Sequence, residues 1–541
     1  MKLTNRRDFV RNISAGFVSI GAPGLLKSYH PSVSVGDTSQ PTSIDAGRQL
    51  FVDDFLIGGC SLKRSMHAAT LQIHNPVLMP ETPLELNGGF RPVACPFDDG
   101  VVYDPKDRLF KMWYHAGWFD GVAYATSEDG LHWHRPNLDV QPGTNRVLAR
   151  QEGYRRDGAT VWLDRETENP AERFKMFVYF RTPKWKGGQI YTSPDGIHWA
   201  LRGRTGPCGD NTCFYYDPFQ KKWVFSIRTY SQDVRVRSYW ACADFVQGAN
   251  WKKEDVVGWL RADHLDLRDP ALGYPPQLYT FSAVAYESLM VGLFGIFKGP
   301  PNEIAAKEGV PKTNDLTVGF SRDGIHWNRP DHNPFLACSR VPGTWNRGYL
   351  HSAGGICLIV GDELHFYFGA FSGVSPKLGG DIYAGASTGL AILRRDGFAS
   401  LDAGLDSGNV TTRAVTFKGK HLFVNVDADL GELRAEMLDE HNQVIPPFSA
   451  ENCLPVSVDS TCQPVTWKHG KDLSTLAGKP VKLRFHLTNG SLYSFWVSPD
   501  KSGASYGYVA AGGPGLNSPI DTTGGSSMGR KFGGGVCSAA S

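Results

Sequence analysis

A seven-residue motif occurs three times in the chain and limits its fold more than any other feature. The three copies read SEDGLHW, SPDGIHW and SRDGIHW and begin at Ser127, Ser193 and Ser321. The Asp side chain accepts backbone N–H groups across a turn, the Gly supplies a positive φ, and the Trp packs between neighbouring sheets. The motif therefore indicates a repeated turn between strands, with a structural rather than a catalytic role.

The motif closes a longer repeat. DDGVVYDPKDRLFKMWYHAG precedes the first copy and RRDGATVWLDRETENPAERFKMFVYF precedes the second, and each reads as apolar strands separated by a polar turn. Three further units contain GDNTCFYYDPF, FSAVAYESLM and GGICLIVGDE. Five four-stranded units of about fifty to sixty-five residues are typical of a β-propeller. We therefore predict an all-β fold with a five-bladed β-propeller over residues 45–403.

The pattern changes after residue 403. AVTFKGKHLFVNVDA, KPVKLRFHLTNG and SLYSFWVSPD are alternating strands separated by Gly, Asp and Asn turns, which predicts a C-terminal β-sandwich over residues 404–515. Small residues dominate from 516 to 541, which predicts a flexible tail. Cys453 and Cys462 lie close in sequence in this strand-rich region, and we expect a disulfide between them in an oxidising compartment.

Residues 1–30 read as an export signal. Arg6 and Arg7 are followed by Phe9 and by the small-residue apolar run ISAGFVSIGAPGLL. A paired arginine before such a run is typical of a twin-arginine signal. We therefore expect a bacterial protein that is exported after folding and is located in the periplasm or outside the cell.

Composition argues against several classes of partner. The net charge is +2 and no basic run stands out, so we expect no nucleic-acid partner. No apolar stretch after the N-terminal segment is long enough to span a membrane. The ten cysteines form no CxxC pair, so we predict no zinc site. We also expect no other catalytic metal and no cofactor. A structural calcium ion in the propeller channel stays open, and no oligomeric state is predicted.

Carboxylates lie at the expected starts of three consecutive inner strands. They are Asp98 and Asp99 in the first unit, Asp157 in the second and Asp210 in the third. Strand starts converge at one end of a propeller channel, where like charges push pKa values apart. Glycoside hydrolysis needs one protonated and one ionised carboxyl group at the bond. The alternative is that each Asp caps a turn.

Arginines next to one of these acids suggest which carboxyl group stays ionised. Arg155 and Arg156 directly precede Asp157. A neighbouring guanidinium lowers a carboxylate pKa by about one to three units. We therefore expect Asp157 to be ionised, so that the shared proton falls to Asp210 or to the Asp98/Asp99 pair.

Glu287, in AYES, is a further candidate acid. It aligns with Asp104, Asp164 and Asp217, which follow the first strand of their units. Because the position recurs, we interpret Glu287 as a turn residue, with a catalytic acid as the alternative.

Other residues near strand starts are candidates for substrate binding. Arginines hold acids ionised or clamp anionic groups, Trp stacks on sugar rings, and His binds hydroxyl groups. For His351 the alternative is a structural histidine whose hydrogen bonds are satisfied. The candidates are Arg91, Arg156, Arg347, His351, Trp118 and Glu85.

These motifs resemble the five-bladed propeller glycoside hydrolases, among them families 32 and 43. GRQLFVDDFLI, YDPKDRLFKMWY, AVAYESLM and YVAAGGPG are similar to segments of exported bacterial proteins grouped near family 32. The resemblance implies a base or nucleophile at Asp98 or Asp99, a pKa-tuning residue at Asp157, and Asp210 in place of the usual acidic Glu. The chain departs from family 32 because it lacks an Asn-Asp-Pro-Asn motif and a Glu-Cys pair. Its Arg-Asp-Pro triplet, 268–270, lies in an expected loop.

Three functions follow as hypotheses. The first is an exported glycoside hydrolase that cleaves a poly- or oligosaccharide with paired carboxylates. The second is a polysaccharide lyase, in which His351 and Arg347 would help to abstract a proton next to a uronate carboxylate. The third is a non-catalytic propeller whose acids bind sugar hydroxyls. All three expect a carbohydrate partner.

Overall fold

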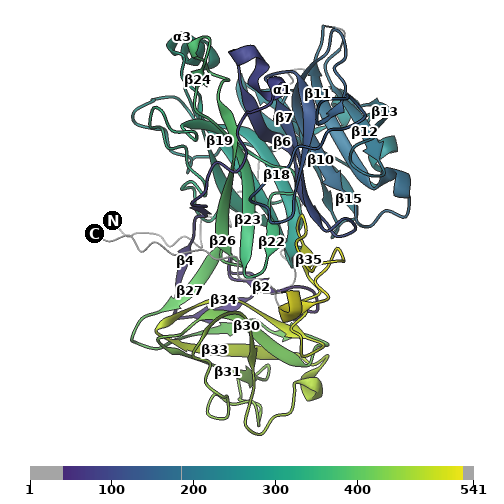
Figure 1. Cartoon of the computed structure of the whole chain (residues 1–541). Helices are drawn as coiled ribbons and strands as arrows, with labels where there is room; N and C mark the ends of the chain where they lie inside the picture. Colours follow the sequence, from purple (N-terminus) through teal and green to yellow (C-terminus); the bar gives the residue numbers. More distant parts are fainter. Residues whose placement is uncertain (1–39, 184, 528–541) are drawn as a thin grey trace, which may run out of the picture.

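A computed structural model describes residues 40–183 and 185–527 (Figure 1). The predicted signal segment and residues 528–541 of the predicted tail lie outside the described residues. Strands dominate the described chain, and they form an upper body and a smaller lower body (Figure 1). None of the described helices is long and apolar enough to cross a membrane. The helical segments are short: α1 (Pro83–Leu86), η1 (Asn87–Gly89), η2 (Pro170–Glu172), α2 (Phe245–Gly248), η3 (Lys253–Asp255), α3 (Asn302–Glu308), η4 (Ser474–Leu476) and η5 (Gly524–Ser527).

The upper body begins with antiparallel sheets that follow the sequence repeat. The first repeat unit forms β6 (Val93–Asp104), β7 (Leu109–Ala116), β8 (Gly121–Ser127) and β9 (Arg146–Leu148). The second forms β10 (Arg155–Leu163), β11 (Phe174–Arg181), β12 (Gly188–Ser193) and β13 (Ala200–Arg204). The third forms β14 (Cys213–Asp217), β15 (Lys222–Ser231), β16 (Val234–Cys242) and β17 (Val257–Leu260). In each, strands adjacent in sequence are adjacent in the sheet.

The last two repeat units depart slightly from this plan. The fourth unit comprises β18 (Gln277–Glu287), β19 (Leu289–Gly299) and β20 (Thr313–Ser321), to which β35 (Tyr508–Val509) adds at the β18 edge. The fifth comprises β21 (Gly348–Ser352), β22 (Leu358–Val360), β23 (Glu363–Phe371) and β26 (Ala386–Arg394), with β5 (Thr70–Leu71) at its edge and the short hairpin β24 (Val374–Ser375) and β25 (Gly379–Gly380) beside it. β26 pairs in parallel with β6 through Ala386 and Val93, so the last unit joins the first.

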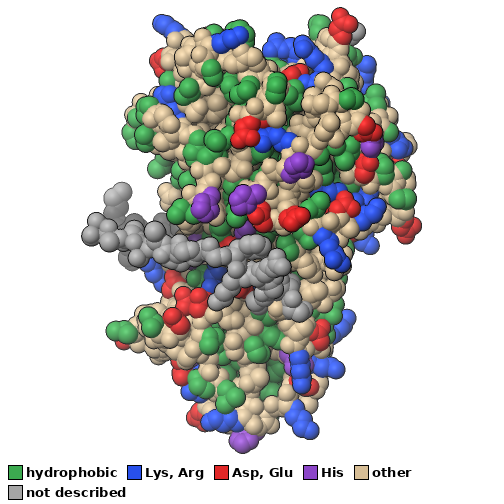
Figure 2. All heavy atoms as spheres, in the orientation of Figure 1, with side chains coloured by type: hydrophobic (Ala, Val, Ile, Leu, Met, Phe, Trp, Pro, Cys, Tyr) green, Lys and Arg blue, Asp and Glu red, His purple; other side chains and the backbone are tan. Residues whose placement is uncertain are grey.

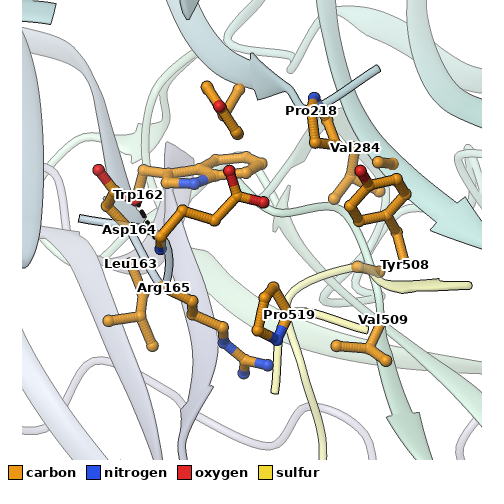
Figure 3. Close-up of a pocket in the computed structure, with 13 residues that line it drawn as sticks. Trp162, Leu163, Asp164, Arg165, Pro218, Val284, Tyr508, Val509 and Pro519 are labelled. Carbon is orange, nitrogen blue, oxygen red and sulfur yellow. Dashed lines mark hydrogen bonds between the residues drawn. The ribbon is translucent and has the colours of Figure 1, made fainter. Parts of the chain in front are cut away.

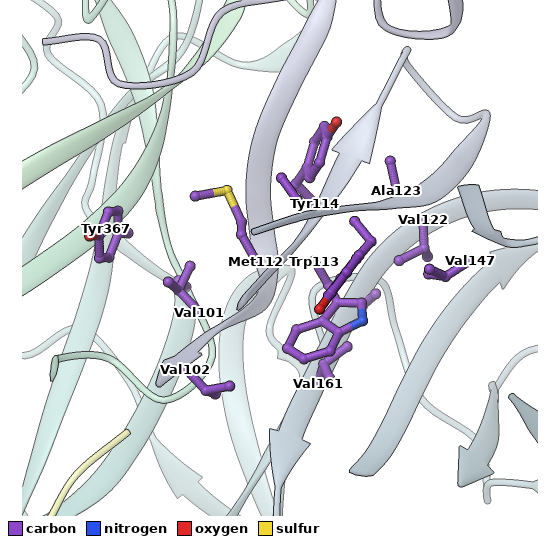
Figure 4. Packing of buried hydrophobic residues seen from close by; sticks show 14 of the residues in the cluster. Val101, Val102, Met112, Trp113, Tyr114, Val122, Ala123, Val147, Val161 and Tyr367 are labelled. Atoms are coloured by element: carbon purple, nitrogen blue, oxygen red, sulfur yellow. The ribbon is translucent and has the colours of Figure 1, made fainter. Parts of the chain in front are cut away.

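The repeated heptad forms the turn that the sequence predicts. Asp195 Oδ1 accepts hydrogen bonds from the backbone N–H groups of Ile197 and His198 at 2.8 and 2.9 Å. Gly196 has φ 83°, and a Cβ there would lie 2.5 Å from Trp113 of the neighbouring sheet. Trp113 in turn donates from Nε1 to the Gly196 carbonyl at 2.7 Å and packs among buried strands (Figure 4). The heptad therefore locks one sheet against the next.

The lower body consists of two sheets around a shared core. One contains β32 (Asp459–Val465), β30 (His421–Asp427), β34 (Gly490–Ser498) and β27 (Ala399–Ala403), extended by β4 (Lys63–Met66) and β2 (Gln49–Leu50). The other contains β3 (Ile57–Cys60), β28 (Gly408–Thr412), β33 (Lys482–Thr488) and β31 (Glu432–Leu438). Beside them, β1 (Thr42–Ser43) pairs with β29 (Val415–Thr416). Side chains from both sheets, among them Phe485 and Phe495, form one buried cluster.

The strand pairing differs from the expected domain boundaries. Residues 42–66 were expected to belong mostly to the upper body, but they pair with strands of the lower body, and Ile44, Phe51 and Leu56 enter its core. β27 also belongs to the lower sheets, although it ends at residue 403. Pairing between chain segments so far apart in sequence leaves no local pattern, which explains the difference.

A buried ion cluster joins the two bodies. Arg48 donates from Nη1 to Asp396 Oδ2 at 3.0 Å, and its Nε lies 3.5 Å from Glu287 Oε1. Arg395 Nη2 lies 3.3 Å from Glu287 Oε1 and 3.1 Å from Asp521 Oδ2. These four pairings are buried. Asp521 therefore fixes part of the expected tail, residues 516–527, to the rest of the protein.

The predicted disulfide is wrong. Cys453 and Cys462 are both free thiols, as are the other described cysteines. Cys453 Sγ accepts a hydrogen bond from the Ala435 backbone at 3.3 Å, whereas Cys462 faces Gly503. The two thiols thus pack against different neighbours.

Candidate active site

A cavity with a volume of about 200 Å³ lies in the upper body; it is called the larger cavity, because it exceeds the second one described below. Asn302, the first residue of α3, lines it, which places the cavity at the α3 end of that body (Figure 1). Its wall combines acidic, basic and aromatic side chains from several sheets: Trp118, Asp157, Arg181, Asp210, Asn211, Arg228, Tyr230, Arg235, Tyr279, Asn302, Lys312, Tyr349 and Tyr383.

A second cavity of about 50 Å³ lies at the opposite end of β10 (Figure 3). Asp164 and Glu166 line it, but Asp164 accepts from Lys175 Nζ at 2.6 Å and from the backbone of Glu166 at 3.0 Å. Tyr508 of β35 also lines it. The carboxylate here serves a turn, as Asp104 and Asp217 do in neighbouring sheets, so the larger cavity is the better candidate for chemistry.

Two predicted acids meet in the larger cavity. Arg181, the last residue of β11, donates from Nε to Asp157 Oδ2 at 2.5 Å and from Nη2 to Asp210 Oδ2 at 2.6 Å. Arg228 of β15 also pairs with Asp210. The β10–β11 pairing shifts register between Arg156 and Ala159, and a Cβ at Gly158 would lie 3.1 Å from the Asn211 backbone. This bulge therefore brings Asp157 close to the loop that carries Asp210.

The environment of Asp157 differs from the expectation. Burial raises its pKa to about 6, the nearby Asp210 charge adds to the rise, and Arg181 opposes it. The two arginines that precede Asp157 in sequence face other groups: Arg156 pairs with Asp99, and the Arg155 guanidinium lies 4.5 Å from the centre of the Phe119 ring. The predicted lowering of the Asp157 pKa is therefore wrong.

Asp98 and Asp99 do not line the cavity, and they lie in the middle of β6 rather than at the expected strand start. Asp99 is fully buried, pairs with Arg156, and accepts from the Phe97 backbone at 2.8 Å. Burial raises its pKa to about 6, and Arg156 opposes the rise. Asp98 is also buried and accepts from Ser352 Oγ at 3.3 Å. The expected group of carboxylates is thus reduced to two at the cavity.

The predicted pair of His351 and Arg347 is not brought together at the cavity. His351 is fully buried, stacks on Phe97 with ring centres 3.8 Å apart, and has its Nδ1 3.9 Å from Asp98 Oδ2. Burial lowers the pKa of His351, and Asp98 opposes this. Arg347 does not line the cavity, and its backbone carbonyl accepts from the Arg340 backbone.

The remaining predicted residues divide between wall and scaffold. Trp118 lines the cavity and stacks on Tyr383 with ring centres 4.4 Å apart. Arg91 does not line the cavity; it donates two 3.0 Å hydrogen bonds to Asp381, which also accepts from the backbone N–H of Tyr383. Glu85 is buried away from the cavity, where it accepts from Tyr114 Oη at 2.6 Å and Arg135 Nε at 2.7 Å and caps α1.

Glu287 lies far from the other candidate acids. It ends β18 with φ 52°, next to β35, and belongs to the buried ion cluster between the two bodies. The structure thus places it at a turn, where the repeat puts it.

Several wall residues were missed by the sequence interpretation. Lys312 Nζ donates to Tyr279 Oη at 3.0 Å and to Tyr349 Oη at 3.3 Å. Arg181 and Arg228 carried a usable signal, because both end the apolar run of the second strand in their units, in FVYFR and FSIR. Arg235 and Lys312 carried none, since each lies outside the aligned strand starts.

The described residues offer one group with metal-ligand spacing, Asp263, Asp266 and His332. Arg329 donates to Asp266 Oδ1 and to Asp263 Oδ2, both at 2.7 Å, so one guanidinium already pairs with both acids. Asp98 and His351, which lie close together in the upper body, gain no third ligand of this kind among the described residues. Calcium takes about six to eight oxygen ligands, so these side chains do not make a calcium site by themselves.

Comparison with known proteins gives low similarity. No family model and no curated protein matches the chain. Among solved structures, a fructofuranosidase from Schwanniomyces occidentalis is 11% identical over 76% of this chain and 98% of its own, with a TM-score of 0.35. A thermostable family-43 glycoside hydrolase is 10% identical over 56% and 92%, with a TM-score of 0.38.

A β-1,2-mannobiose phosphorylase from Listeria innocua is 12% identical over 60% of this chain and 96% of its own, with a TM-score of 0.37. The predicted resemblance to family-32 and family-43 enzymes is confirmed to the extent that such enzymes are among these similar structures. The TM-scores are low, and they assign no activity or substrate to this chain.

Proposed function

We propose that the upper body is a five-bladed β-propeller and the lower body a β-sandwich. Five repeat units support closure of a ring, because the second, third and fourth form separate antiparallel sheets and the parallel contact of β26 with β6 joins the fifth unit to the first in one sheet. Two sheets around one apolar core support the sandwich.

We propose that the protein is a glycoside hydrolase that acts at the larger cavity. The observation that carries this proposal is the meeting of Asp157 and Asp210, from two consecutive sheets, on the single guanidinium of Arg181. Glycosidic bond cleavage typically requires a pair of carboxyl groups at the bond. Trp118, Tyr230 and Tyr383 supply rings that suit the faces of sugars.

The two acids have different roles in this proposal. Asp157 is the general acid, because its raised pKa of about 6 keeps a proton on it in mildly acidic solution. It donates that proton to the glycosidic oxygen as the bond to the anomeric carbon breaks. Asp210, contacted by Arg181 and Arg228, is the carboxylate that acts at the anomeric carbon as base or nucleophile. Arg181 holds both groups in position.

Asp157→Asn tests the proposal, because it keeps the shape of the side chain and removes the transferable proton. Against a panel of polysaccharides, we expect wild type to release reducing ends and the variant to lose about 10²- to 10⁴-fold in turnover, the range of general acid catalysis. Folding of the variant is checked by its thermal unfolding midpoint. Near-normal turnover of a folded variant would reject the assignment.

A polysaccharide lyase is the second candidate, favoured by the contacts of Lys312 with Tyr279 and Tyr349 in the same cavity. A lyase removes a proton next to a uronate carboxylate, and a lysine or tyrosine would act as the base. The products decide between the candidates: a lyase leaves an unsaturated end that absorbs in the ultraviolet, and a hydrolase does not. A glycan-binding propeller would release nothing.

We further propose that the protein is exported in folded form. The support is the Arg6-Arg7 pair and the small-residue apolar run that follows it. Replacing both arginines by lysine should keep a tagged protein in the cytoplasm of a bacterial host, and unchanged export would contradict the proposal.

A further inference from the structure

The larger cavity carries more positive than negative side chains. Arg181, Arg228, Arg235 and Lys312 line it, against the two carboxylates of Asp157 and Asp210. Both carboxylates pair with Arg181, and Asp210 also pairs with Arg228. The ion pairs of the two cavity acids are with Arg181 and Arg228, and among the described residues neither Arg235 nor Lys312 has a carboxylate within 4.0 Å. Two cations of the wall are therefore left without a direct ion pair.

Neutral groups hold these two cations in place. Arg235 donates from Nη1 to Gln277 Oε1 at 2.8 Å and lies 5.1 Å from the centre of the Tyr279 ring. The Lys312 ammonium lies 4.4 Å from the centre of the Tyr349 ring and 5.1 Å from that of Tyr383. Hydroxyl groups and aromatic faces stabilise a cation but leave its charge uncompensated.

The burial of Lys312 makes the missing counter-charge costly. Its side chain is buried, and burial together with Arg235 lowers its pKa to about 7. Arg228 Nη1 is likewise buried without a hydrogen-bond partner among the described residues. Burying a charge is unfavourable unless it is paired and hydrogen-bonded, so an anion that enters the cavity gains a set of preformed donors.

From this arrangement we infer that the substrate is an acidic glycan, and that Arg235 and Lys312 bind its anionic group beside the Asp157–Asp210 pair. The group is a carboxylate, as in a uronic acid, or a sulfate ester. A carboxylate is planar and a sulfate ester is tetrahedral, and the oxygens of either can accept from the guanidinium fork of an arginine and from the three N–H groups of a lysine. That the ligand is a glycan rests on the proposed function, whereas the anion site itself is inferred from the two cations that have no ion pair.

Anion binding is tested first, without turnover. Sodium glucuronate and sodium sulfate are each titrated against the full-length protein at constant ionic strength, and the unfolding temperature is recorded. We expect one of them to raise it, and its identity tells a carboxylate site from a sulfate site. Lys312→Met and Arg235→Gln should weaken this binding about 10- to 100-fold, the value of a hydrogen bond between charged groups. The exposed residues Lys479 and Arg261 provide matched controls, Lys479→Met and Arg261→Gln.

Substrate preference is tested second, with an acidic polysaccharide and its carboxyl-reduced or desulfated counterpart. We expect kcat/KM to be higher for the acidic form, and Lys312→Met to remove the difference by raising KM. Equal rates on both forms, or anion binding that both variants retain, would overturn the inference while leaving a hydrolase in place. Anion binding that needs Lys312 and Arg235, with no glycan cleaved, would reject the proposed function instead and keep the anion site.

Discussion

Arg181 Nη2 lies 2.6 Å from Asp210 Oδ2, so the last residue of β11 holds a carboxylate that precedes the first strand of the next sheet. The same guanidinium holds Asp157 of its own sheet. An arginine thus fixes the spacing of two acids across the boundary between two sheets. Figure 2 shows acidic and basic side chains interspersed on the surface in view, in contrast to this cationic cavity.

The pH dependence of activity should follow Asp157. Burial and the charge of Asp210 raise the pKa of Asp157, whereas Arg181 and Arg156 lower it. If Asp157 donates the proton, kcat/KM falls as pH rises through about 6, because the acid form is lost. In Arg181→Gln a group that lowers this pKa is gone, so the fall should move to higher pH. A pH profile of kcat/KM measures this, and a shift to lower pH would contradict the assignment.

Glu287→Gln should cost stability but not activity. It leaves Arg48 and Arg395 buried with less negative charge, and breaking a buried ion pair costs about 3 kcal/mol or more. Urea unfolding measures the loss, with Glu254→Gln, at an exposed glutamate, as the control. A folded but inactive Glu287→Gln protein would mean that the general acid lies at Glu287.

Lys312→Met should stabilise the protein in a pH-dependent way. Burial and Arg235 lower the Lys312 pKa, while the charges of Asp210 and Asp157 oppose this. Below about pH 7 the lysine is charged in both the folded and unfolded states, so the folded protein bears the whole cost of the buried charge. Between about pH 7 and the ordinary pKa of lysine, the folded state has released the proton and the unfolded state still holds it, so wild-type stability rises with pH.

The gain in unfolding temperature from Lys312→Met should therefore be largest below pH 7 and shrink as pH increases. Thermal unfolding of both proteins across this range measures it. A gain that grows with pH would mean that the folded protein raises the Lys312 pKa above its ordinary value instead of lowering it.

Gly196→Ala should destabilise the protein more than Gly143→Ala. Both glycines have positive φ, 83° and 82°, so alanine is strained at either position. Only at Gly196 would the added Cβ also meet Trp113, at 2.5 Å, whereas nothing lies within 4 Å at Gly143. We expect the backbone strain to cost about 1 kcal/mol at each site and the clash to add about 1–3 kcal/mol at Gly196.

Urea midpoints of the two variants provide the comparison, and turnover per folded molecule should be unchanged in both. Equal destabilisation would mean that the heptad turn does not depend on contact with the neighbouring sheet.

The repeat units and their turns could be predicted from the sequence because both depend on local chemistry. Alternation of apolar residues specifies a strand, and Asp195 and Gly196 specify a turn within a few residues of themselves. The same alignment placed Glu287 with the turn acids and Asp157 and Asp210 at strand starts. These are properties of each unit alone.

The partners of the site residues were decided by the tertiary structure. Successive side chains on a strand point to opposite faces, so Arg156, adjacent to Asp157 in sequence, faces Asp99 instead. Arg181 reaches Asp157 because β10 and β11 pair, and it reaches Asp210 because two sheets pack together. Asp98 and Asp99 were expected at a strand start, but they lie in the middle of β6 and are buried outside the wall of the cavity. Sequence determined which residues begin and end the strands; packing between sheets determined which charges meet.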